Sequence, residues 1–129
     1  MLGVNYWALV VAAVAAFVAS TAWYIAFAKQ LVKLGSAAGD VNSPAWKKLF
    51  VLGEHLVIAF VLAQLLVHLD VVDWKRALLL GVGLWIAFPA LVVSSSIVWE
   101  NVPRKLGAIH AGDWLAKMLV MAVILAVWR

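Results

Sequence analysis

Residues 6–27 read YWALVVAAVAAFVASTAWYIAF and contain no charged side chain. A helix needs about 20 predominantly apolar residues to cross the hydrocarbon core of a bilayer, which is about 30 Å thick. The run is too long for the apolar part of a signal peptide, no positively charged segment precedes it, and lysines follow it. We therefore predict a retained membrane-spanning helix over about residues 4–34.

The composition of the whole chain agrees with a bilayer environment. Of the 129 residues, 67% are hydrophobic and only 12% are charged, and the mean hydropathy is +1.07. A soluble domain of this size needs more polar side chains to cover its surface. Cysteine is absent, which excludes disulfides, thiolate catalysis and cysteine-ligated metals for this chain.

Three further apolar ranges are long enough to cross the membrane, at about residues 44–69, 74–99 and 104–128. Ser43 has the character of an N-cap with Pro44 at the first helical position. Pro89 predicts a kink in the third range, because proline removes a backbone donor. A polar loop is expected at residues 36–42.

The short connections predict that neighbouring helices run antiparallel. The expected fold is all-α, a transmembrane up-down antiparallel four-helix bundle that forms a single domain over residues 1–129. Small residues recur every four positions in the first helix, at Ala8, Ala12, Ala16 and Ser20. This spacing allows another helix to approach closely in lipid.

The formal net charge of +4 predicts contact with anionic lipid head groups, and we expect no nucleic-acid partner. Six basic residues flank the first and third loops: Lys29, Lys33, Lys47, Lys48, Arg104 and Lys105. The other side has only Lys75, Arg76 and Arg129. The positive-inside rule therefore predicts cytoplasmic first and third loops, with both termini periplasmic or extracellular. Inversion and dual topology stay open.

Ionisable residues inside a membrane are expensive and usually mark function. In the second helix, Lys47, Glu54, Val61 and His68 are seven apart and share one face, which should point inward or towards another subunit. In the fourth helix, His110, Asp113 and Lys117 share a face, and the last two have the favourable spacing for an ion pair. We select Glu54 as the leading functional candidate, because its helix offers it no cation at the same depth.

The predicted topology places these groups in the cytoplasmic half of the bilayer. Ser94, Ser95 and Ser96 are expected there too. The candidate binding or proton-linked residues in this polar layer are Trp23, Tyr24, Glu54, His55, Glu100, His110, Asp113 and Lys117. Two interpretations stay open: a polar network that fixes helix register, or a pocket for a small molecule, an ion or a proton.

Most of the eight tryptophans lie near predicted helix ends, as expected for an interfacial aromatic belt. Trp23, Trp85 and Trp114 lie deeper. No motif for a phosphate loop, a nucleophile or a metal site is present, so we expect no catalytic residue, metal or cofactor. A haem held by His55 and His110 is a weaker alternative.

Three stretches carry a family resemblance. They are Val4-Asn5-Tyr6-Trp7 with the alanine-rich helix leading to Trp23-Tyr24, then residues 100–106 (ENVPRKL) with 109–115 (IHAGDWL), and finally residues 121–125 (MAVIL) with Trp128. In their order and spacing the chain resembles an uncharacterised family of small bacterial membrane proteins, domain of unknown function 1761. The resemblance implies four spans and a bacterial inner membrane, and it implies no activity.

Three hypotheses for function follow. The first is a non-enzymatic bundle that self-associates or serves as a subunit of a larger membrane complex. The second is a small proton-linked transporter or small-molecule-binding membrane protein that uses the polar layer. The third, which the sequence supports least, is an enzyme of lipid chemistry. The expected partners are the bilayer, a further protein copy or subunit, and a small-molecule or lipid ligand.

Overall fold

The computed structural model describes residues 4–36 and 42–128, and within these ranges the chain is helical and has no strand. Four helices are long and apolar enough to cross a membrane: Tyr6–Ala26, Ala45–His68, Trp74–Trp99 and Arg104–Val127. They confirm the four predicted spans. Most of the predicted loop at residues 36–42, and Arg129, lie outside the described residues.

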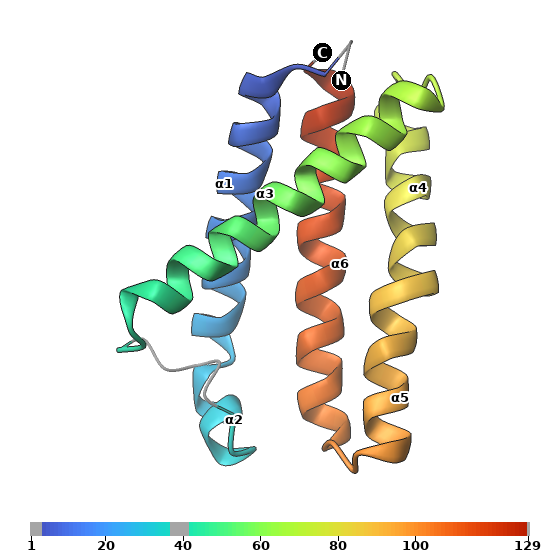
Figure 1. Ribbon diagram of the computed structural model, residues 1–129. Coiled ribbons are helices and arrows are strands. Elements are labelled where there is room, and N and C mark those ends of the chain that lie inside the picture. Colours follow the sequence, from blue (N-terminus) through green and yellow to red (C-terminus); the bar gives the residue numbers. More distant parts are fainter. Residues whose placement is uncertain (1–3, 37–41, 129) are drawn as a thin grey trace.

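The C-terminal helix α6 (Arg104–Val127) is the centre of the molecule, and the other long helices pack around it. It contacts α1 (Tyr6–Ala26), α3 (Ala45–His68) and the third span. Figure 1 shows α1, α6 and the third span standing side by side, whereas α3 crosses α1 and α6 at a steep slant. The helices therefore do not form an evenly packed bundle, because α3 diverges from the lower part of the third span.

The first predicted helix consists of two helices, α1 and the short α2 (Ala28–Lys33), joined at Phe27. The Asn5 side chain caps α1 by accepting hydrogen bonds from the backbone N–H groups of Trp7 and Ala8, at 3.0 and 3.2 Å. Gly35 ends α2 with a φ of +76°, a left-handed conformation that glycine adopts without steric cost.

The third span is interrupted where the sequence predicts a kink. It consists of α4 (Trp74–Trp85), the π-helical turn η2 (Ile86–Ala90) and α5 (Leu91–Trp99), and Pro89 lies within η2. Proline cannot donate the backbone hydrogen bond that an α-helix requires, and a wider turn accommodates this loss. The predicted irregularity is thus present as a π-bulge.

Small residues form the inner face of α1. Ala8, Ala12, Ala16 and Ser20 are all buried, as the four-residue spacing predicts. The helices that pack against α1 are α6 and α3 of the same chain. The close approach that these residues allow is therefore used within the monomer.

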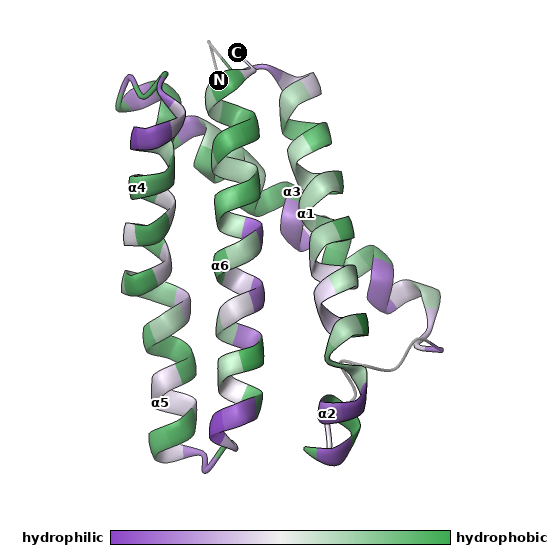
Figure 2. Ribbon diagram, turned by 180° about the vertical axis from the view of Figure 1, so that it is seen from behind, coloured by the Kyte–Doolittle hydropathy of each residue, from purple (hydrophilic) through white to green (hydrophobic). Residues whose placement is uncertain are grey.

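Hydrophilic residues occur at two kinds of place (Figure 2). They mark α2 and the turns at the ends of the molecule, and they also occur inside the spans, mainly along the middle of α6. The beginning of α1, the end of α6 and the turn between α3 and α4 lie at one end (Figure 1). The turn between α5 and α6 lies at the other end, together with α2.

Candidate functional site

The polar residues inside the spans centre on an ion pair within α6. The Lys117 Nζ atom lies 3.2 Å from Asp113 Oδ2, and both side chains are almost fully buried. The same ammonium group lies 3.9 Å from the centroid of the Trp114 ring, a cation–π contact that is strongest where water is excluded. The spacing of four residues predicts this pair, and the structure contains it.

Tyr24 and His110 form a second polar contact next to the ion pair. The Tyr24 hydroxyl and His110 Nδ1 are 2.7 Å apart, which joins the end of α1 to the first half of α6. His110 precedes Asp113 by three residues, so this contact lies about 4.5 Å nearer to the α5–α6 turn along the helix. Tyr24 also interacts electrostatically with Asp113.

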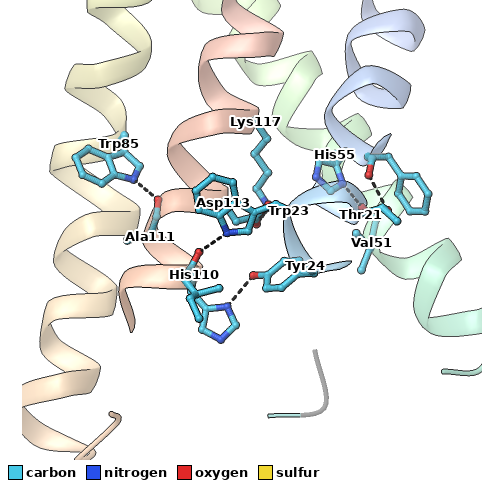
Figure 3. Close-up of polar contacts among 12 residues, drawn as sticks. Thr21, Trp23, Tyr24, Val51, His55, Trp85, His110, Ala111, Asp113 and Lys117 are labelled. Carbon is cyan, nitrogen blue, oxygen red and sulfur yellow. Dashed lines mark hydrogen bonds and ion pairs between the residues drawn. The ribbon is translucent and has the colours of Figure 1, made fainter. Parts of the chain in front are cut away.

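His55 brings α3 to the same place. Its side chain is fully buried, and its Nδ1 atom lies 2.7 Å from the carbonyl oxygen of Val51. Because a carbonyl can only accept, Nδ1 carries a proton and donates it to this bond. The ring lies within electrostatic range of Lys117, Asp113 and Glu54. We call Tyr24, His55, His110, Asp113 and Lys117 the polar centre (Figure 3).

Two buried atoms of the polar centre have no hydrogen-bond partner. They are His55 Nε2 and Asp113 Oδ1. In the neutral ring with a proton on Nδ1, Nε2 is an acceptor, and an ionised carboxylate is also acceptor-only. Burial of an acceptor without a partner costs about 1–3 kcal/mol. The polar centre therefore lacks hydrogen-bond donors at two positions.

Two deep tryptophans attach α6 to its neighbours. The Trp23 indole of α1 donates to the carbonyl of Ile109 at 2.9 Å, and the Trp85 indole of α4 donates to the carbonyl of Ala111 at 2.8 Å. Gly112 makes room for Trp23, because a Cβ atom at this glycine would lie only 2.4 Å from the indole ring. These contacts explain why both tryptophans lie deeper within the spans than the tryptophans near the helix ends.

The structure does not place every candidate in this group. Glu54 is exposed on the outer side of α3, and Glu100 is exposed at the end of α5. The other three residues of the predicted α3 stripe are exposed as well: Lys47, Val61 and His68. The prediction that this stripe faces inward is therefore wrong, and its alternative, a face towards another subunit, stays a prediction. Helix α3 buries His55 instead, one residue or about 100° further around its axis.

The polar layer is also built from fewer helices than expected. Residues of α1, α3 and α6 form it, and the third span adds only the Trp85 indole. Ser94 and Ser96 donate to carbonyl oxygens of their own helix, at 2.7 and 3.1 Å. The third span therefore does not contribute Ser94, Ser96 and Glu100 to this layer, contrary to the prediction from topology.

Sequence reasoning did not identify the backbone groups that complete the site. The carbonyl oxygens of Val51, Ile109 and Ala111 accept from side chains on this or another helix. Every residue has a carbonyl, so no pattern singles these out. Gly112 could have been identified from the sequence, because a glycine within a helix often marks a place of close packing. Among residues 4–36 and 42–128, no group of three or more potential ligands is placed to hold a metal.

Residues 7–126 match the family described as "Protein of unknown function (DUF1761)". No curated protein and no solved structure matches the chain. The match extends from the start of α1 almost to the end of α6 and includes the whole polar centre. The chain, a protein with four candidate membrane-spanning helices, therefore belongs to the DUF1761 family, whose function is unknown.

Proposed function

We propose that the protein is a small proton-linked membrane carrier whose binding site is the polar centre. The observation that supports this proposal is the pair of buried atoms without partners, His55 Nε2 and Asp113 Oδ1. A small ligand that donates two hydrogen bonds would satisfy both atoms, and a proton would satisfy either one of them. No catalytic step is part of the proposal.

A purely structural role for the polar centre explains these atoms less well. A network that serves only to fix helix register gains most when each member is satisfied, and unsatisfied members make it worse than an apolar core. Ionisable groups within a membrane span are costly to bury and most often line pathways. A site that binds and releases a ligand requires acceptors that are left open in the empty state.

The residues of the polar centre take different roles in this proposal. Asp113 Oδ1 and His55 Nε2 receive the proton or ligand, and Lys117 pairs with the other carboxylate oxygen, Asp113 Oδ2. The contact between Tyr24 and His110 lies nearer to the α2 end of the molecule. It provides the next proton-accepting and proton-donating groups in that direction.

Infrared difference spectroscopy of the protein in lipid, between acid and neutral pH, tests the proposal. We expect a band from a buried protonated carboxyl group, which disappears in Asp113→Asn and is unchanged in Glu54→Gln. Glu54 is the matched control, because it is an exposed carboxylate in the second span, α3. A band that disappears in Glu54→Gln instead, or no band in the wild type, would contradict the proposal.

The outer face of α3 supports a second proposal, that the chain self-associates or joins a larger membrane complex. Glu54 is exposed on this face within a membrane-spanning helix, and Lys47 and His68 lie on the same face near its two ends. Exposure of the Glu54 carboxylate to lipid is costly, and a neighbouring subunit would reduce that cost. The small residues of α1 do not support this proposal, because they are already buried within the chain.

Single-cysteine crosslinking tests self-association directly, because the chain contains no cysteine of its own. Phe50 on α3 and Leu79 on α4 are similarly exposed, at 64% and 72%. In native membranes we expect Phe50→Cys to form disulfide-linked dimers and Leu79→Cys to remain monomeric. Absence of dimers from both variants, with no other protein crosslinked, would rule out association through α3.

For orientation we propose a bacterial inner membrane with both termini on the outer side. The support is the excess of basic residues flanking the first and third loops, such as Lys29 and Arg104. A reporter enzyme that is active only outside the cytoplasm should be active when fused to the C-terminus. An inactive reporter would reverse the orientation.

A further inference from the structure

A groove of about 550 Å³ lies on the side of the molecule opposite to the α1 contact of α6. Helix α3 forms one wall, the region from the end of α4 to α5 forms the other, and α6 forms the floor. All of the residues that line it are apolar; they include Val57, Val61, Leu84, Phe88, Trp114 and Met118. The groove is separate from the polar centre, except that Trp114 belongs to its floor and also contacts Lys117.

The groove results from the directions of the helices. Helix α3 slants across α1 and α6, whereas the third span stands beside α6 (Figure 1). The two walls therefore diverge, and their side chains cannot meet over α6. Val61 and Phe88 on opposite walls are 51% and 63% exposed. Because these walls belong to membrane-spanning helices, the groove faces the hydrocarbon part of the bilayer.

We propose that the groove binds one acyl chain of a membrane phospholipid. Its lining offers no polar side chain to hold a polar ligand, and the surroundings of a membrane span supply acyl chains at high concentration. The volume of about 550 Å³ lies within the range of about 300–1,000 Å³ that is usual for sites that bind small molecules.

The exposed lining of the groove is far smaller than the roughly 800 Å² that each partner of a specific protein–protein interface buries. This difference favours an acyl chain over a helix from a second copy. A bound chain would lie against Trp114, whose ring contacts the Lys117 ammonium group. It would thereby keep water away from that side of the ion pair.

Photocrosslinking tests the proposal with the full-length protein in vesicles of phosphatidylethanolamine and phosphatidylglycerol. The probe is a phosphatidylethanolamine with a diazirine in the middle of one acyl chain. We expect labelled peptides from α3 and from η2–α5 that include groove residues. Val61→Trp fills the groove from one wall and should reduce this labelling at least fivefold. Leu79→Trp, at an exposed site outside the groove, should leave it unchanged.

A second substitution, Val92→Trp, fills the groove from the other wall and keeps the test valid if Val61→Trp does not fold. Three results would overturn the proposal. One is equal labelling of the groove and of the Leu79 surface in the wild type, and another is unchanged labelling in both filled variants. The third is a disulfide-linked dimer of Val92→Cys, on the wall that does not belong to α3, which would identify a second copy as the occupant. None of these results depends on proton binding at Asp113.

Discussion

At the scale of single residues, the ion pair between Asp113 and Lys117 allows both charges to be buried and leaves one carboxylate oxygen without a partner. Each charge would be expensive to bury alone in a membrane span, and the partner one helical turn away offsets part of that cost. Their separation of 3.2 Å follows from local helix geometry. The pair satisfies Asp113 Oδ2 but leaves Oδ1 without a partner. The ion pair explains why the charges can be buried, whereas the open oxygen supports a function.

Breaking the pair from one side should be more harmful than removing it completely. Lys117→Met leaves a buried unpaired carboxylate, which we expect to lower the free energy of unfolding by about 3–5 kcal/mol. The double variant Asp113→Leu with Lys117→Met should recover most of this loss, because no charge remains. Unfolding in mixed micelles measures both. Equal stability of Lys117→Met and the double variant would show that the two charges are not coupled.

At the scale of elements, α6 is held between α1 and α4 by two indole groups. Trp23 and Trp85 donate to carbonyl oxygens of α6 that are only two residues apart. The hydrogen bonds position α1 at the depth where Tyr24 reaches His110. The site therefore depends on the register of three helices, and Gly112 leaves the room on α6 that the Trp23 ring occupies.

Gly112→Ala should disturb this register. The new methyl group would lie 2.4 Å from the Trp23 ring, so Trp23 must move, and we expect a loss of about 1–3 kcal/mol from overpacking. Gly83→Ala is the control, since a Cβ atom there meets no atom within 4 Å. Thermal unfolding in detergent compares the two. If both variants unfold at the wild-type temperature, Trp23 does not fix the position of α1.

At the scale of the whole molecule, the packing is uneven. Helices α1, α3 and α6 enclose the polar centre. The third span makes its main contacts with α6 and not with α1 or α3. The slant of α3 both brings His55 to the ion pair and opens the apolar groove on the other side. One geometric feature thus produces both proposed sites.

The small-residue face of α1 should be required for the fold of the monomer. Ala12 is fully buried, so Ala12→Leu would force α1 away from its neighbours, and we expect a loss of about 1–3 kcal/mol. Val14→Leu, on the exposed side of the same helix, should be neutral within about 0.5 kcal/mol. Unfolding of the purified monomer measures the difference. A stable Ala12→Leu monomer would instead point to a role of this face outside the monomer.

The sequence alone determined the features that depend on neighbours along the chain. The four spans follow from long, predominantly apolar runs, the ion pair follows from a spacing of four residues, and the interruption of the third span follows from Pro89. The tertiary structure alone decided which side of α3 faces inward, and therefore that His55 rather than Glu54 joins the polar centre. The physical reason is the solvent. Lipid-facing and protein-facing sides of a membrane helix are both apolar, so hydropathy carries little information about rotation, and only packing against other helices sets it.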